Sequence, residues 1–204
     1  MSILVIDNND SFTYNLVQLI EECGFIDFRV IKNTGLDMDA VASFSKILIS
    51  PGPGMPDETP NISEVINKYH KTKSILGVCL GHQAIAEYFG AEIINVPLPF
   101  HGIKSKVFIK DKDNHLFSGL HESFDAGRYH SWVVSEKNFP ECLKITAVSD
   151  DGLIMAVSHK IYDVHGIQFH PESIMTPDGL QIIRNWLEKY PLEVSKSNDS
   201  HEVT

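Results

Sequence analysis

The sequence lacks long hydrophobic runs, clusters of basic residues and regularly spaced cysteines. No apolar stretch approaches the roughly 18 residues that a membrane helix needs, and the start MSILVIDNND has neither the basic flank nor the apolar length of a signal peptide. The net charge of -10, with 27 acidic against 17 basic residues, argues against a nucleic-acid partner. We therefore expect a cytoplasmic protein whose partners are small molecules or another protein.

Cysteine is scarce as well. The sequence has three cysteines, Cys23, Cys79 and Cys142. Their number is odd and their spacing is not C-x-x-C, so the sequence predicts neither a disulfide framework nor a zinc ribbon. Cys23 in EECGF and Cys142 in PECLKI have no distinctive neighbours, and we interpret both as structural. Cys79 has a different setting.

The order of apolar and amphipathic segments predicts a single α/β domain over residues 1–190. Short apolar runs alternate with helical patterns in the first half, and strands dominate after residue 90. We expect a mainly parallel open sheet with helices on both faces, a smaller antiparallel sheet in the C-terminal half, and a polar, disordered tail over 191–204. The expected strands are 3–6, 46–49, 74–78, 91–96, 103–109, 143–148, 152–159 and 164–169, the last two as a hairpin, and the expected helices are 12–22, 61–70, 81–89 and 177–189.

Cys79 lies in ILGVCLGHQ, directly after an apolar run and before a helical pattern, with Gly77 and Gly81 two residues away on either side. This is the G-x-nucleophile-x-G spacing of a nucleophile on a strained strand-to-helix turn. Larger side chains at the glycines would collide with the strand, and the N-terminus of the helix would favour the thiolate. A free cysteine is often just a small buried residue, and the elbow alone does not exclude that alternative.

A base and an orienting group are expected in GIQFHPES, where His170 ends an apolar run and Glu172 follows two residues later. Pro171 fixes the backbone between them, so the carboxylate can be held against the imidazole at a small entropy cost. Singly, a structural histidine and a solvated carboxylate are the ordinary interpretations. Together with Cys79 the two residues predict a triad of nucleophile, base and orienting carboxylate.

The segment SPGPG (50–54) ends another apolar run of the parallel region. Loops at the carboxyl ends of parallel strands converge on the ligand crevice, and glycines expose N–H groups that a substrate oxygen can approach. We therefore predict that Gly52 or Gly54 supplies one oxyanion donor and the N–H of Leu80 the other. A rigid turn is the alternative for these five residues.

The remaining histidines are not expected to form a metal site. His165 and His170 are five residues apart on a strand, so their side chains tend to opposite faces, and His82, His101 and His130 stand in unrelated segments. For His82, three residues beyond the cysteine, we expect a capping or packing role. SPGPG lacks the ending of a phosphate loop, and no dinucleotide fingerprint is present.

A series of motifs runs along the chain: DNNDSFTYN (7–15), SPGPGMP (50–56), GVCLGHQAI (77–85), HGIKS (101–105), RYHSW (128–132), DGLIMAVSH (151–159) and GIQFHPESI (166–174). Together these motifs resemble the class I, triad-type glutamine amidotransferases, over about residues 3–190. Within that class the first motif is similar to the small subunits of anthranilate synthase and aminodeoxychorismate synthase. The resemblance also implies a flavodoxin-like layering of the fold.

The resemblance implies that Cys79, His170 and Glu172 hydrolyse glutamine through a cysteine thioester. The ammonia would pass to a chorismate-using synthase subunit making anthranilate for tryptophan biosynthesis, with aminodeoxychorismate and folate biosynthesis as the alternative. No cofactor is expected in this chain, and magnesium is expected in the partner. The residues that the resemblance assigns to glutamine binding are Gly52, Pro53, Gly54, Gln83, Ser131 and Trp132.

Three places depart from the usual family pattern. Ile103 stands where H-G-K-x-S has lysine, Trp132 stands where leucine is common, and DETPN (57–61) replaces an acidic-Ala-Gly run. We expect Trp132 to contact glutamine mainly through its backbone, and Ile103 to affect the contact with the partner.

Two other classes of function remain open. A catalytically silent module would keep the fold and only stabilise or regulate a partner, and the intact triad argues against it. A stand-alone cysteine hydrolase of γ-glutamyl or peptide bonds would share the elbow, act as a monomer and need no chorismate-binding subunit encoded nearby.

Overall fold

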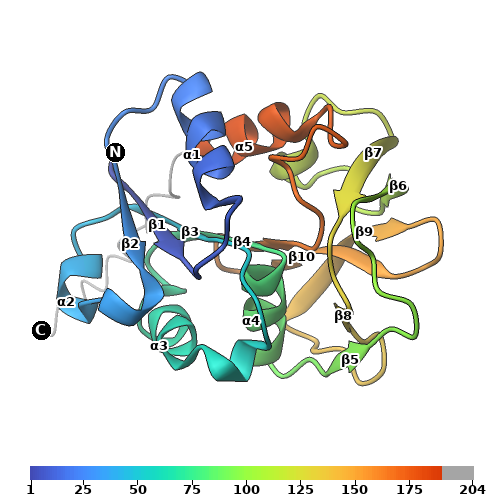
Figure 1. Ribbon diagram of the computed structural model, residues 1–204, viewed down its shortest axis with the longest axis horizontal. Coiled ribbons are helices and arrows are strands. Elements are labelled where there is room, and N and C mark those ends of the chain that lie inside the picture. Colours follow the sequence, from blue (N-terminus) through green and yellow to red (C-terminus); the bar gives the residue numbers. More distant parts are fainter. Residues whose placement is uncertain (190–204) are drawn as a thin grey trace, which may run out of the picture.

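The computed structural model describes residues 1–189, in which strands and helices alternate in the first half and strands predominate afterwards (Figure 1). The tail predicted for 191–204 lies outside the described residues. The strands are β1 (Ile3–Asp7), β2 (Phe28–Lys32), β3 (Lys46–Ile49), β4 (Ser74–Val78), β5 (Ile93–Asn95), β6 (Ile103–Ile109), β7 (Ser123–Arg128), β8 (Trp132–Val134), β9 (Leu143–Ser149), β10 (Ile154–His159) and β11 (Val164–Ile167). The helices are α1 (Thr13–Glu22), α2 (Met38–Val41), α3 (Pro60–Tyr69), α4 (Leu80–Tyr88) and α5 (Gly179–Glu188), with short 3₁₀ helices η1 (Asn33–Gly35), η2 (Pro56–Glu58) and η3 (His115–Phe117).

One nine-stranded sheet spans the molecule in the order β2-β1-β3-β4-β11-β10-β9-β6-β7. The first five strands are parallel, and the last four pair antiparallel. A separate antiparallel sheet joins β5 and β8. The predicted α/β fold is confirmed, as is the hairpin of β10 and β11. Most C-terminal strands extend the large sheet, and only the β5–β8 pair forms the smaller one.

Helices cover both faces of the parallel strands, as the apolar runs predicted. Helices α1 and α5 lie together on one face (Figure 1), where Leu16 and Ile20 of α1 and Trp186 of α5 join one buried cluster. Helices α3 and α4 cover the opposite face, where Ile66 and Ile85 belong to a second cluster. A strand buried on two sides needs apolar residues at every position, which explains the continuous runs.

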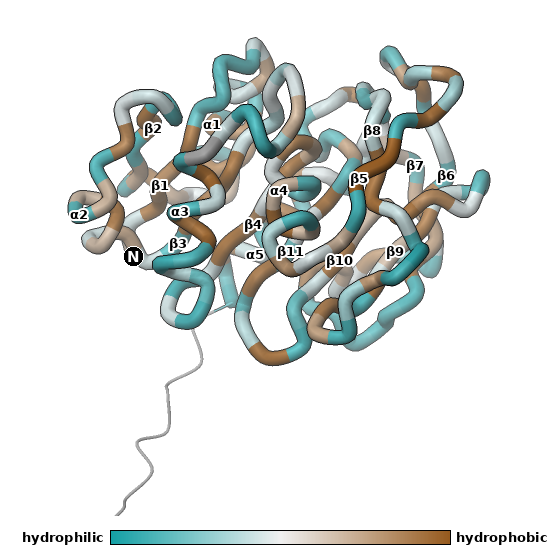
Figure 2. The backbone as a smooth tube through the Cα atoms, turned by 90° about the horizontal axis from the view of Figure 1, so that it is seen from below, coloured by the Kyte–Doolittle hydropathy of each residue, from teal (hydrophilic) through white to brown (hydrophobic). Residues whose placement is uncertain are grey.

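Figure 2 shows these hydrophobic stretches along β1, β3 and β4. Every residue of the three strands is buried. Strand β2 lies at the sheet edge and is only partly buried, so its sequence FRVIK carries charges and was not predicted as a strand. Among residues 1–189, no helix has both the length and the apolar character required to cross a bilayer.

Candidate active site

Cys79 occupies the turn between β4 and α4 in a strained backbone conformation, with φ 52° and ψ -99°. The flanking glycines have the role that their spacing predicted. A Cβ atom on Gly77 would lie 2.3 Å from the carbonyl oxygen of Gly81, and one on Gly81 would lie 2.5 Å from the carbonyl oxygen of Ile49. Close packing of α4 against β3 and β4 therefore requires glycine at both positions. The turn brings Cys79 to the start of α4, where the first N–H groups have no helical partner.

His170 and Glu172 form a buried pair just beyond β11. The Nδ1 atom of His170 lies 2.5 Å from Oε1 of Glu172, and the two side chains are 3% and 0% exposed. Thr176 fixes the backbone here, because its hydroxyl donates to the carbonyl oxygen of His170 and accepts from the N–H of Gly127. Since Nδ1 is engaged by the carboxylate, Nε2 remains available to Cys79.

The protonation of His170 suits a thiolate neighbour. Burial alone would lower the pKa of this imidazole, but its interactions with Cys79 and Glu172 raise the pKa to about 10. His170 can therefore hold a proton that leaves the Cys79 sulfur. The structure thus brings together the three residues that sequence reasoning selected from distant segments.

A pocket of about 240 Å³ opens beside Cys79. Its volume lies below the roughly 300–1,000 Å³ typical of drug-sized ligands, which suits a small metabolite. Tyr129 and His130 also line it, and neither was predicted. The residues predicted to bind glutamine or to stabilise the oxyanion also line the pocket: Gly52, Pro53, Gly54, Leu80, Gln83, Ser131 and Trp132.

The SPGPG loop approaches the elbow closely and is pinned by the segment that follows it. A Cβ atom on Gly52 would lie 2.7 Å from the side chain of Leu80. Gly54 has φ +82°, and the Glu58 carboxylate next to it accepts the N–H of Met55 at 2.9 Å. The DETPN departure therefore supplies a 3₁₀ turn and a carboxylate that hold the loop.

A polar network that the sequence did not predict fixes the RYHSW segment. Arg128 is 1% exposed, pairs with Asp151 at 3.1 Å, and donates from Nε to Nε2 of His130 at 3.2 Å. Burial first, and then the charge of Arg128, lower the pKa of His130 to about 3, so its ring is neutral. Its Nδ1–H therefore donates to the carbonyl oxygen of Trp132 at 3.1 Å. The same oxygen accepts from Gln83 at 2.8 Å, so the backbone of this pocket wall is held from two sides.

Residues outside the pocket follow their structural interpretations. Cys23 and Cys142 are partly buried and pack against apolar clusters, and burial raises the pKa of the Cys23 thiol. His82 is fully buried, and a Cβ atom on Gly166 would lie 2.7 Å from its Nδ1. His82 therefore packs α4 against β11, and burial lowers the pKa of its ring to about 4.

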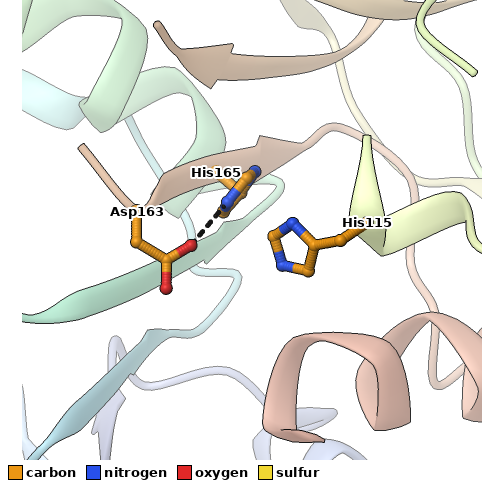
Figure 3. Close-up of side chains that lie close together, drawn as sticks. All are labelled: His115, Asp163 and His165. Carbon is orange, nitrogen blue, oxygen red and sulfur yellow. Dashed lines mark hydrogen bonds and ion pairs between the residues drawn. The ribbon is translucent and has the colours of Figure 1, made fainter. Parts of the chain in front are cut away.

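A second group of titratable side chains lies at the opposite end of β11, where His115, Asp163 and His165 approach one another (Figure 3). Nε2 of His165 lies 2.9 Å from Oδ1 of Asp163. The ammonium of Lys189 lies 3.3 Å from that oxygen and 3.3 Å from Nδ1 of His115. Since a lysine ammonium already occupies the position between two of the three groups, we assign them to a buried ion-pair network and not to a metal centre.

A strained cysteine with a buried His–Glu pair beside a small pocket is the arrangement used for acyl transfer through a thioester. The glutamine amidotransferase class-I family matches residues 4–190, and the chain belongs to this family.

Similar proteins carry more specific names. Anthranilate synthase component 2 of Pyropia yezoensis is 45% identical over 189 residues, which covers 91% of this chain and 98% of the relative. Aminodeoxychorismate/anthranilate synthase component 2 of Bacillus subtilis is 42% identical over 194 residues, with coverage of 94% and 98%. A crystal structure of a glutamine amidotransferase from Thermotoga maritima shares the fold at a TM-score of 0.74 and 14% identity, covering 92% of this chain and 96% of that one.

Proposed function

We propose that this chain is the glutamine-hydrolysing subunit of a chorismate-using synthase that makes anthranilate. The observation that carries the proposal is the convergence of Cys79, His170 and Glu172 beside a pocket lined by the residues predicted to bind the substrate glutamine. The relatives named as component 2 of anthranilate and aminodeoxychorismate synthases support the choice of synthase.

In the proposed reaction the Cys79 thiolate attacks the side-chain amide carbon of glutamine. His170, which received the thiol proton, gives a proton to the departing ammonia, and Glu172 keeps the imidazole in position. A γ-glutamyl thioester remains on Cys79. Water activated by His170 then releases glutamate and restores the thiol.

The negative charge on the amide oxygen needs donors at the elbow. The N–H of Leu80 stands at the first position of α4, and the Gly52–Gly54 loop lies across from it at the same pocket. These groups are the proposed oxyanion donors. Gln83 already uses Nε2 for the carbonyl oxygen of Trp132, so its Oε1 is the end offered to polar hydrogens of the substrate.

Exposed apolar side chains on segments beside the pocket support a protein partner there. Phe12 is 37% exposed, and its ring centroid lies 5.7 Å from that of Tyr129 and 6.1 Å from that of His170. Ile174, two residues beyond Glu172, is 96% exposed. A partner that covers these groups would also shield ammonia from the water that converts it to ammonium.

Ile103 stays a predicted partner contact. It begins β6 opposite Arg128 and is 48% exposed. Aminodeoxychorismate stays the alternative product, because one relative carries both synthase names. Magnesium in the partner and a cytoplasmic location also stay predictions.

The test is reconstitution with chorismate-using subunits from the same genome, with the amine product identified by chromatography. We expect anthranilate from glutamine, and glutaminase activity that rises when the partner holds chorismate. Formation of aminodeoxychorismate alone would replace anthranilate by the alternative. Equal glutaminase rates with and without the partner would contradict the coupling.

Cys79→Ala separates catalysis from a silent binding role. The variant should lose glutamine-dependent synthesis, while synthesis from added ammonium salts continues in the partner. If the variant supported glutamine-dependent synthesis as well as the parent, the silent module would be the correct reading.

A further inference from the structure

The side-chain amide of Gln168 contacts the nucleophile in addition to the three triad residues. Its side chain is fully buried, and Nε2 donates to Sγ of Cys79 at 3.6 Å. A buried amide keeps its hydrogen bonds, and here one partner is the reacting atom itself. We propose that Gln168 is a further catalytic residue, whose N–H holds the Cys79 sulfur in place and stabilises it as thiolate. This proposal rests on the proposed function, because it assumes that the Cys79 thiolate is the nucleophile.

The hydrogen-bond network determines which end of the Gln168 amide faces the sulfur. Nε2 of Gln83 donates to the carbonyl oxygen of Trp132, and a carbonyl can only accept. The same nitrogen lies 3.1 Å from Oε1 of Gln168 and donates to it. The NH₂ end of Gln168 is therefore directed at Cys79. A flipped amide would place NH₂ against NH₂ at Gln83 and a carbonyl oxygen against the thiolate.

The short segment beyond β11 carries both this residue and the base. Both backbone N–H groups, of Gln168 and of His170, are bonded to carbonyl oxygens of neighbouring segments. The chain bends at Gln168 and Phe169 and then forms a bridge with Gly127 at His170. Phe169 between them is fully buried in the apolar cluster that also includes Cys79. Gln168 and His170 both interact with Cys79, and the backbone hydrogen bonds of one short segment hold both residues.

The amide favours the ionised form of the sulfur. When the proton passes from Cys79 to Nε2 of His170, the sulfur gains a full negative charge, and the N–H from Gln168 becomes a charge-assisted hydrogen bond. A neutral thiol accepts the same donor only weakly. His170 stabilises the thiolate by its charge, while Gln168 does so without titrating.

The experiment measures how fast iodoacetamide alkylates Cys79 as the pH is varied, with peptide mass spectrometry to separate this residue from the other cysteines. Gln168→Met keeps the length of the side chain and removes the donor. Gln168→Glu keeps its shape and sets a carboxylate against the thiolate. Gln181→Met is the matched control, because the Gln181 amide bonds to Asn185 within α5.

We expect the Met variant to shift the alkylation profile to higher pH. Its glutaminase kcat/KM should fall about ten- to a hundredfold, the range for losing a hydrogen bond to a charged group. The kcat/KM of the Glu variant should fall further, and the kcat/KM and alkylation profile of the Gln181→Met control should match those of the parent. Circular dichroism verifies that each variant is folded. If the Glu variant does not fold, the Met variant alone decides.

A folded Met variant with the parent's pH profile and an alkylation rate within about twofold would overturn the proposal and leave Gln168 as a packing residue. Alkylation needs neither glutamine nor a partner. Slow alkylation of Cys79 in the parent would instead count against the proposed nucleophile. The two failures are thus distinguishable.

Discussion

Strand β11 has a histidine–carboxylate pair at each end, and only one of the two faces a nucleophile. Asp163 and His165 lie at its start, and His170 and Glu172 lie just beyond its end. In each pair one residue separates the partners, and the nitrogen-to-oxygen distances are 2.9 Å and 2.5 Å. Sequence spacing and burial alone do not distinguish the two pairs.

The neighbours of each pair make the difference. Burial lowers the pKa of both imidazoles, and at His165 it outweighs the charge of Asp163, with Lys189 and Lys46 lowering it further. At His170 the interactions with Cys79 and Glu172 overcome burial and raise the pKa to about 10. A histidine beside a carboxylate becomes a catalytic base when a nucleophile and a pocket adjoin it, and a structural group when lysines do.

The sharpest way to break the comparison is to remove each imidazole in turn. His170→Asn removes the acceptor of the Cys79 proton, so glutaminase kcat/KM should fall roughly 10²- to 10⁴-fold. Ammonia-dependent synthesis by the partner should be unchanged, because it does not need the triad. Both rates are measured on the reconstituted complex.

The matched control is His165→Asn at the other end of the same strand. It should retain glutaminase kcat/KM within about threefold while losing stability. If the two variants lost activity equally, β11 would be acting only as a scaffold and the assignment of His170 as base would fail.

Asp163→Asn tests the structural pair by stability. Lys46 is fully buried with its ammonium donating to the carbonyl oxygens of Trp186 and Lys189, and burial lowers its pKa to about 8. Removing the nearby carboxylate leaves buried positive charge uncompensated, which costs about 3–5 kcal/mol in comparable cases. Urea unfolding at pH 7 measures the loss. A free energy of unfolding within about 1 kcal/mol of the parent would show that this network contributes little.

Local patterns were enough to predict the fully buried parallel strands and to select the three residues of the candidate triad. The apolar runs of β1, β3 and β4 report burial on two faces, and the glycines around Cys79 report a close approach of backbones. The apolar runs and the glycine spacing each involve only a few neighbouring residues, so both can be recognised in the sequence. The edge strands β2 and β7 gave weaker signals, because one side of each meets solvent and admits polar residues.

The second layer of the site could not be predicted because it depends on contacts between distant segments. Gln83 and Gln168 are 85 residues apart in the sequence, and Arg128 and Asp151 are 23 residues apart. A polar residue two positions before His170 in an otherwise apolar run was the one signal for Gln168 in the sequence. The residues around RYHSW do not predict that His130 is neutral or that it donates a hydrogen bond to the carbonyl oxygen of Trp132.

Opposite pKa shifts at the two ends of β11 predict opposite effects of pH on stability, about 1.4 kcal/mol per pH unit for each proton at most. The lowered pKa of His165 means that only the unfolded chain takes its proton below about pH 6.5, so stability falls as the pH falls. The raised pKa of His170 gives a contribution that is present at low pH and lost as the pH rises toward 10. Urea unfolding of both Asn variants should therefore show a shallower acid decline for His165→Asn and a shallower alkaline decline for His170→Asn. Identical slopes in parent and variants would mean that neither imidazole titrates differently on unfolding.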